Sequence, residues 1–518
     1  MSNGVSISRH RFLSLWLMRL ATDRIARQRS APDPRPLVVT GRRGNIERLT
    51  AVDAAAAALG LRLGLALAEA RARYPDLAVV AEDAADDRRL LDGIADWCQR
   101  YTPLLAVDPP DGLLLDIAGC AHLYGGEERL LADLLARIGG FGFAARAAIA
   151  STIGAAFAAA RFGDAGIVAP GKERTMLAPL PMAALRLPED TVAALRRVGL
   201  KRIGDILDLP RAPLAARFGD DVLRQLARAL GTEREPLTPL LPVAAYVAEQ
   251  SFSEPIAREE DVLHVIARLA ARLEPVLERR GEGARCIELA LFRTDGAVRR
   301  IVVATSRSVR DPSDVRALYV ERLASLADAL DPGFGFDLAR LSVLAAEPCP
   351  PEQIGLGERA DDADLDRLID RLSARLGARR VMRLVANDSH IPEVAAAAVP
   401  AQADIARENG WAAFRRFRNG VALSPRPLRL LGKPEPIEAI ATVPDGPPVR
   451  FRWRRAFQEV VAADGPERIE GAWWSEEGGP ARDYFRVEDK AGLRFWVFRA
   501  GLYRLTAQPQ WFLHGTFA

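Results

Sequence analysis

The stretch RYTPLLAVDPPDGLLLDIAG, residues 100–119, decides the fold class of the N-terminal part of the chain. Its last third, residues 112–117, is an apolar run that follows a turn rich in Pro and Gly, and this predicts a buried strand. A second apolar run, RFLSLWL at residues 11–17, predicts another buried strand near the start of the chain. We therefore expect a β-sheet in the core of this part.

Outward from these two runs, short apolar stretches alternate with helical patterns. Strands are expected at residues 36–40, 77–81 and 144–150, and helices within residues 51–74, 86–101, 127–138 and 154–161. The helices within residues 51–74 are expected to break at Gly60 and Gly64. Strands that alternate with helices predict an α/β or α+β domain.

The later parts of the chain have other patterns, and a length of 518 residues also indicates several domains. Residues 176–237 contain short helical stretches between Pro and Gly residues, which predicts a small helical domain. A helix at residues 261–280, a hairpin around Asp295-Gly296 and a helix at residues 314–329 predict a third domain.

The C-terminal part begins with an acidic amphipathic helix that is expected at residues 361–376. Six of the eight Trp residues lie after residue 410, which argues against a disordered tail. Alternating runs such as ARDYFRVEDKAGLRFWVFRAGLYRL predict β-hairpins in this region. The end of the chain should therefore form a separate β-rich domain.

Composition narrows the class of protein. The formal net charge of +3 indicates no partner by itself, because basic residues can gather on one face. The four Cys are far apart and form no CxxC pair, which disfavours a zinc site or disulfides and fits a reducing cytosol. No apolar run reaches the roughly 18 residues that a membrane span needs. We expect a soluble, cytoplasmic protein with no membrane partner.

This order of elements resembles the right-handed DNA polymerases of the Y family. Three strings carry the resemblance: residues 100–119, GLRLGLALAEARARYPDLAVV at 60–80, and LRRVGLKRIGDIL at 195–207. It implies an α+β multidomain chain. The implied parts are a palm-like part (1–30 and 76–168), a fingers-like part (31–75), a helix-hairpin-helix thumb-like part (169–240), a little-finger-like part (246–348), a linker (349–402) and a β-rich aromatic C-terminal interaction domain (403–518).

Nucleotidyl transfer needs two divalent cations, and these need clustered carboxylates. The resemblance places the acidic positions of the first strand on Trp16 and Met18, and those of the second strand on Asp111 and Gly112. Only Asp111 keeps a carboxylate, and we interpret it as a solvated turn residue. The resemblance thus implies a polymerase-like protein that is not an enzyme and that holds no metal or cofactor.

Other substrate-binding positions are replaced as well. The fingers Tyr and Arg of active members correspond to Ala54 and Ala57, and a Lys that contacts the triphosphate corresponds to Phe157. The Gly hairpin of the thumb falls on residues 186–188, where Pro188 has no N–H to donate to a DNA phosphate. Five basic residues of the thumb remain candidates for phosphate contacts, although a solvated helical face would show the same pattern: Arg186, Arg196, Arg197, Lys201 and Arg202.

These replacements resemble the ImuB branch of the Y family, which belongs to bacterial damage-inducible (SOS) mutagenesis cassettes. The opening LWLMRLATDR and the ending WFLHGTFA extend the resemblance to nearly the whole chain. It implies three protein partners: the sliding clamp, an error-prone C-family DNA polymerase and an ImuA-type RecA-like protein. The candidate clamp-binding peptide contains Gln353, Ile354 and Leu356 but lacks the terminal aromatic residue of the QxxLF pattern, and an ordinary loop is the alternative.

Residues 415–455 interleave Arg with aromatic residues, which suits stacking on single-stranded DNA together with phosphate contacts. Arg452, Arg454 and Arg455 are the candidates for such contacts. A protein-binding surface or a plain strand face would have the same composition.

The function implied by the resemblance is that of a non-catalytic adaptor in DNA repair. It would link the clamp, the C-family polymerase and the RecA-like protein at damaged DNA during translesion synthesis, with modest DNA affinity. One alternative is a divergent but active Y-family polymerase that uses Asp108, Asp111 and Asp116. The other is a DNA-binding protein outside mutagenesis.

Overall fold

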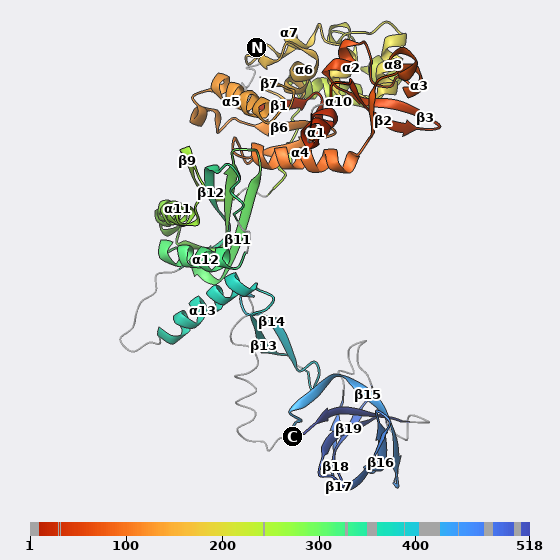
Figure 1. Cartoon of the computed structure of the whole chain (residues 1–518), viewed down its shortest axis with the longest axis vertical. Helices are drawn as coiled ribbons and strands as arrows, with labels where there is room; N and C mark the ends of the chain where they lie inside the picture. Colours follow the sequence, from red (N-terminus) through yellow and green to blue (C-terminus); the bar gives the residue numbers. More distant parts are fainter. Residues whose placement is uncertain are drawn as a thin grey trace. The chain divides into compact units, whose positions relative to one another are not determined.

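The computed structural model describes residues 10–29, 31, 33–241, 244–326, 330–349, 360–387, 389–403, 425–443, 445–470, 480–501 and 509–517 (Figure 1). Two compact units are present: one contains residues 1–303 and 308–353, and the other contains residues 304–307 and 354–518. No described helix is long and apolar enough to cross a membrane.

The central element of the first unit is a five-stranded sheet with the order β5-β6-β1-β7-β8. Its strands are β1 (Phe12–Leu17), β5 (Leu105–Asp108), β6 (Gly112–Asp116), β7 (Ala145–Ala150) and β8 (Gly166–Ile167). The two runs that opened the sequence analysis, β1 and β6, are antiparallel neighbours in the middle of this sheet. The two buried strands predicted from those runs are confirmed.

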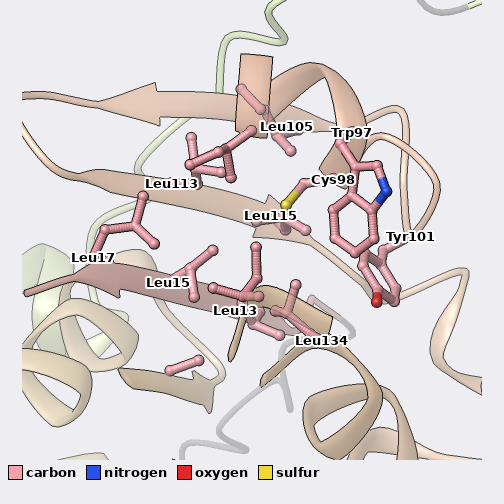
Figure 2. Close-up of a cluster of buried hydrophobic side chains, with 14 of the residues drawn as sticks. Leu13, Leu15, Leu17, Trp97, Cys98, Tyr101, Leu105, Leu113, Leu115 and Leu134 are labelled. Carbon is pink, nitrogen blue, oxygen red and sulfur yellow. The ribbon is translucent and has the colours of Figure 1, made fainter. Parts of the chain in front are cut away.

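Both faces of the sheet are covered, which explains why its central strands are almost entirely apolar. One face carries Leu13, Leu15 and Leu17 and packs against α4 (Ala84–Cys98) and α5 (Glu127–Gly140). Figure 2 shows these leucines beside Trp97, Cys98 and Tyr101, which belong to α4 and the turn after it. The other face packs against α6 (Ile153–Phe162), whose row of small Ala residues allows close approach.

A second, three-stranded sheet has the order β3-β2-β4 and consists of β2 (Leu37–Arg43), β3 (Ile46–Val52) and β4 (Ala78–Ala81). It packs against α1 (Leu20–Gln28) on one side, while two short helices, α2 (Ala54–Ala58) and α3 (Leu67–Arg73), pack on the other. The sequence pattern predicts helices within residues 51–74. The structure corrects its first two residues, because Ala51 and Val52 pair with Val39 and Val38 of β2 and thereby extend β3.

A helical segment follows and confirms the small helical domain that was predicted. It contains α7 (Glu173–Leu177), η2 (Met182–Leu185), α8 (Glu189–Arg197), η3 (Ile203–Asp205), α9 (Arg211–Phe218) and α10 (Asp220–Leu230). Its buried residues form one apolar cluster, which also includes Ala158 of α6. The segment is therefore packed directly on the helix that covers the central sheet.

The last part of the first unit is a four-stranded sheet with the order β11-β10-β12-β9. It contains β9 (Tyr246–Ile256), β10 (Glu282–Arg293), β11 (Val298–Val309) and β12 (Phe336–Pro348), with α11 (Glu259–Arg280) and α12 (Pro312–Ala324) packed beside them. The predicted hairpin at Asp295-Gly296 joins β10 to β11, and Gly296 adopts a φ of 91° there. Strands β9 and β12 were not predicted.

The second unit contains α13 (Ala360–Leu376), a hairpin of β13 (Met382–Ala386) and β14 (Ala396–Pro400), and a closed six-stranded barrel. The barrel strands are β15 (Arg429–Ala441), β16 (Pro448–Trp453), β17 (Ala456–Ile469), β18 (Arg482–Asp489), β19 (Arg494–Ala500) and β20 (Gln510–Thr516). Phe451, Phe485, Phe495 and Trp511 fill its interior. The β-rich C-terminal domain is confirmed, whereas its closure into a barrel was not predicted.

Candidate functional site

The ends of three adjacent strands bring the predicted metal positions together. Trp16 of β1 lies opposite Gly112 of β6, and Gly112 lies opposite Asp108 of β5. Asp111 immediately precedes β6, and its carbonyl accepts a hydrogen bond from the backbone N–H of Leu17 at 2.9 Å. Positions nearly 100 residues apart in sequence therefore form one compact group.

Arg161, near the C-terminal end of α6, lies between the two carboxylates of this group. Its Nη1 lies 2.8 Å from Asp111 Oδ1, and its Nη2 lies 3.3 Å from Asp108 Oδ2. Trp16 donates from Nε1 to the other carboxylate oxygen of Asp111 at 3.0 Å. Because the Arg161 side chain is only 12% exposed, solvent screens these ion pairs weakly.

Aromatic rings lie against the same guanidinium. The Arg161 guanidinium carbon is 5.3 Å from the ring centroid of Trp16 and 4.7 Å from that of Phe157, within cation–π range. Phe157 and Arg161 are four residues apart on α6, so they share one face of the helix. Arg186 lies 5.7 Å from the Phe157 ring centroid. The result is an aromatic–arginine series made of Trp16, Arg161, Phe157 and Arg186.

Gly112 leaves the space that the Arg161 side chain uses. A Cβ atom at Gly112 would lie 2.7 Å from Arg161 Nη2 and 3.0 Å from Asp108 Oδ2. Such distances are too short for ordinary contacts, so any side chain at Gly112 would displace the guanidinium or the carboxylate. Gly112 thus provides no carboxylate, and its lack of a side chain makes room for the Arg161 guanidinium.

The interpretation of Asp111 as a solvated turn residue is wrong. Its carboxylate is bonded to both Trp16 and Arg161, and its side chain is 27% exposed. The neighbouring Asp108 is more strongly enclosed: burial raises the pKa of its carboxyl, and the charge and hydrogen bond of Arg161 act in the opposite direction. Asp116, the third acid considered in the sequence analysis, lies at the far end of β6 and pairs with Phe12.

Arg186, one of the thumb hairpin positions, lies beside this group through its contact with the Phe157 ring. Arg186 adopts a left-handed conformation with a φ of 57°, which a glycine would adopt without strain. Its Nη2 lies 2.6 Å from Glu235 Oε2, so its side chain is engaged within the protein. Pro188 caps α8, and the first turn of that helix carries Glu189 and Asp190, which disfavour an anion.

The other positions that the resemblance aligns with binding residues of active polymerases carry no polar side chain. Met18 follows β1, is 37% exposed, and bonds to Ala144 through its backbone N–H. Ala54 and Ala57 are exposed methyl groups on the short helix α2. Within the described ranges, no three His, Cys, Asp or Glu side chains are grouped so that they could hold a metal ion.

Sequence reasoning missed Arg161. The available signal was its position four residues after Phe157 in a segment that was already predicted to be a helix, which puts both side chains on one face. The ion pairs of Arg161 depend on the pairing of β5, β6 and β1, and no local pattern reveals that register.

The structure places four of the five thumb candidates on one exposed stretch, whereas Arg186 is paired with Glu235. Arg196 and Arg197 lie in the last turn of α8, and Lys201 and Arg202 follow in the turn before η3. All four are exposed, and none takes part in a salt bridge among the described residues.

The candidates for DNA contacts in the barrel differ from those of the thumb, because two of them form ion pairs. Arg452 points outward from β16 and lies 3.4 Å from Glu438, and Arg454 lies 2.6 Å from Glu435. Arg454 and Arg455 form the turn between β16 and β17, with φ values of 47° and 72°. The candidate clamp peptide at Gln353, Ile354 and Leu356 lies outside the described residues.

Comparison with known proteins identifies the family. The impB/mucB/samB family model matches residues 26–161, and the impB/mucB/samB family C-terminal domain matches residues 244–356. Protein ImuB of Caulobacter vibrioides is 42% identical over 461 residues, which make up 87% of this chain and 98% of that protein. The chain belongs to the ImuB family. The resemblance to the ImuB branch is thereby confirmed.

More distant similarity extends to polymerases. DNA polymerase IV of Opitutus terrae is 27% identical to this ImuB-family chain over 236 residues, which cover 43% of the chain and 58% of that protein. Among solved structures, DinB from Sulfolobus solfataricus matches with a TM-score of 0.39 and 12% identity, over 65% of this chain and 99% of that chain. The insertion ternary complex of Dbh DNA polymerase matches with a TM-score of 0.39 and 13% identity, over 64% and 99%.

The ImuB-family chain therefore has a Y-family polymerase-like fold of mixed helices and sheets, followed by a β-rich C-terminal domain with a barrel, as predicted. Family membership supports a role associated with mutagenesis and an interaction with DNA.

Proposed function

We propose that this ImuB-family chain is a non-catalytic adaptor in damage-induced translesion synthesis. Its partners are a sliding clamp, an error-prone C-family DNA polymerase and an ImuA-type RecA-like protein, and it holds them together at damaged DNA. The polymerase-like part supplies shape and moderate DNA affinity, and the C-terminal part supplies protein contacts. Synthesis itself is carried out by the C-family polymerase.

The observation that carries the non-catalytic part of this proposal is the position of Arg161. Two-metal catalysis needs carboxylates whose oxygens are available to cations. Here the oxygens of Asp111 accept hydrogen bonds from Arg161 and Trp16, and one oxygen of Asp108 faces Arg161. A guanidinium keeps its charge throughout the biological pH range, so it competes permanently with a divalent cation for these oxygens.

The aromatic–arginine series supports the same proposal, because it occupies the place where active members bind the nucleotide. Phe157 stands where active members offer a Lys to the triphosphate, and its ring is occupied by Arg161 and Arg186. Arg186 in turn is bonded to Glu235. An incoming nucleotide would have to displace a set of ion pairs in order to reach the strand ends.

A divergent polymerase remains the alternative, because Asp108 and Asp111 lie close enough to contact one guanidinium. Primer extension distinguishes the two functions. The full chain is incubated with a primed template, all four deoxynucleotides and Mg²⁺ or Mn²⁺. The adaptor proposal expects no incorporation. Extension that is lost in the variant Asp108→Ala/Asp111→Ala would establish a catalytic role and contradict the proposal.

The adaptor part needs its own test. Immobilised full chain is mixed with purified sliding clamp and, separately, with purified C-family polymerase. We expect both to be retained, and we expect Gln353→Ala/Leu356→Ala to lose the clamp while it keeps the polymerase. If neither protein is retained, a DNA-binding role outside mutagenesis becomes the better account.

A further inference from the structure

Helix α13 is oriented with its polar side toward the protein. Asp366, Asp370 and Ser373 are 4%, 4% and 5% exposed. The backbone N–H of Ser306 donates to Asp370 Oδ1 at 2.6 Å, and Gln402 Nε2 donates to the same oxygen at 2.9 Å. These bonds fix the rotation of the helix about its axis, because each buried carboxylate needs its donors.

The opposite side of α13 is an exposed leucine stripe, which consists of Leu365, Leu368, Leu372 and Leu376. Their exposed fractions are 53%, 51%, 38% and 49%. Spacings of three, four and four residues place them on one face of a helix. A helix on the surface of a soluble domain normally shows the reverse pattern, with its apolar stripe inward. A row of exposed leucines on a helix anchored by its polar face indicates a surface that another helix covers.

The charged residues beside the leucine stripe indicate which partner helix binds to it. Asp364, Arg371 and Arg375 are separated by seven and four residues, so they lie in one row along the leucine stripe. This row is acidic near the N-terminal end of the helix, where Asp364 also lies 3.3 Å from Arg367 of its own helix, and basic toward the C-terminal end. A second α13 that runs antiparallel brings Asp364 of one copy near Arg375 of the other. The two-fold symmetry of such a pair produces this contact twice.

We propose that the leucine stripe of α13 is a self-association surface, at which a second copy of this chain binds with its α13 antiparallel. A parallel pair would place the two charge rows on opposite sides of the interface, where they do not meet, whereas an antiparallel pair brings them together, so the charge row favours the antiparallel arrangement. One helix pair buries less than the roughly 1,000 Å² of a stable specific interface, so the dimer is weak and forms at high local concentration. This inference does not depend on the proposed adaptor function.

Sedimentation velocity of the full chain over a range of micromolar concentrations tests the proposal. We expect a reversible monomer–dimer equilibrium. Leu368→Glu/Leu372→Glu should weaken association at least about tenfold, because two charges would have to be buried at the helix contact. The control is Leu63→Glu, which alters an exposed leucine of the first unit (66% exposed) and should leave the equilibrium unchanged.

A charge exchange separates self-association from binding of a different partner. Asp364→Arg should weaken the dimer roughly fivefold, since exposed ion pairs contribute modestly. The double variant Asp364→Arg/Arg375→Asp should restore it, because each new Arg then meets a new Asp on the other copy. Circular dichroism of each variant verifies that α13 is still helical.

Three results would overturn the proposal: a chain that stays monomeric, a dimer that the leucine variants do not weaken, or a double variant that fails to recover. A monomeric chain whose leucine variants lose the C-family polymerase would assign the stripe to that protein instead.

Discussion

Arg161 Nη1 lies 2.8 Å from Asp111 Oδ1, and this contact joins the helix that covers the central sheet to the turn between two of its strands. In an active polymerase of this fold, the resemblance places a metal-binding acid at Asp111. The present chain supplies a cation from its own sequence instead. The carboxylates are therefore neutralised without any ion from solution, and their place in the fold becomes structural.

If that role is structural, removal of Arg161 should destabilise the first unit. Arg161→Met leaves Asp108 and Asp111 enclosed without their cation, and loss of one partner of a largely buried pair costs about 2–4 kcal/mol. Urea unfolding, followed by tryptophan fluorescence, measures the change in the free energy of unfolding. Arg89→Met removes an exposed arginine and serves as the control, with an expected change below about 0.5 kcal/mol.

The triple variant Arg161→Met/Asp108→Asn/Asp111→Asn should recover much of that loss, because it leaves no enclosed charge without a partner. If the triple variant were less stable than Arg161→Met alone, the ion pairs would not be the origin of the effect.

A side chain at Gly112 should be tolerated only when Arg161 is absent. Gly112→Ala places its Cβ 2.7 Å from Arg161 Nη2, and overpacking of this kind costs about 1–3 kcal/mol. In an Arg161→Ala background the shortest contact is removed and only the contacts with Asp108 at 3.0 and 3.1 Å remain, so a double-mutant cycle should give a coupling energy of at least about 1 kcal/mol. Gly119→Ala, where no atom lies within 4 Å of the new Cβ, is the matched control. Additive effects in the Gly112 cycle would contradict the geometry.

The basic residues at the end of α8 and in the turn that follows it should contribute most of the DNA affinity. Arg452 and Arg454 of the barrel are paired with carboxylates. Four thumb candidates are exposed and form no salt bridge among the described residues: Arg196, Arg197, Lys201 and Arg202. Replacing Arg196, Arg197, Lys201 and Arg202 by Ala should weaken duplex binding. It should also lower the slope of log affinity against log salt by roughly 3.6, at about 0.9 for each of the four lost phosphate contacts.

Fluorescence anisotropy with a labelled duplex at several salt concentrations measures that slope. A control of equal charge change replaces four exposed arginines from other surfaces: Arg71, Arg88, Arg268 and Arg279. An equal decrease in both variants would mean that net charge, not the thumb surface, determines binding.

The barrel should lose stability in mild acid through His514. This side chain is fully buried, its Nδ1 lies 2.8 Å from the hydroxyl of Tyr484, and its ring stacks on Trp496. Burial lowers the pKa of His514 to about 4, Glu393 opposes that shift, and Arg482 adds to it. The unfolded chain has a pKa near 6.5, so it binds a proton between pH 6.5 and 4 that the folded barrel does not bind. Stability is therefore complete above pH 6.5 and falls by about 1.4 kcal/mol per pH unit toward pH 4.

Thermal unfolding between pH 7.5 and 4.5 measures this dependence. His514→Asn keeps a polar group beside Tyr484 but cannot titrate, and it should flatten the curve. The variant His264→Gln, which alters an exposed histidine of α11, should retain the full dependence. A His514→Asn barrel with an unchanged pH profile would show that another group titrates.

Local patterns predicted much of the fold because its central strands are buried on both faces. Runs such as residues 12–17 are apolar at every position except Ser14, so their strand assignment depends on no partner. Strand β3 was partly misjudged, since Ala51 and Val52 have no strong pattern of their own and become strand only by pairing with β2. For the candidate site, Trp16 and Gly112 could be placed by resemblance. The cation between Asp108 and Asp111 could not, because its position depends on the three-dimensional packing of α6.

Closure of the C-terminal barrel limits how proteins can bind it. Each strand from β15 to β20 pairs with two other strands of the barrel, and β15 pairs with β20 through residues 429–437 and with β16 through residues 438–441. A closed sheet offers no edge at which an extended peptide could be added as a further strand. Main-chain pairing with an added strand is therefore restricted to stretches where one side of a strand is unpaired, such as residues 460–469 of β17, which pair with β18 alone. Elsewhere, a protein that binds this domain has to contact side chains on the outer wall or in the connecting turns. The specificity of such binding should therefore be sensitive to single surface substitutions.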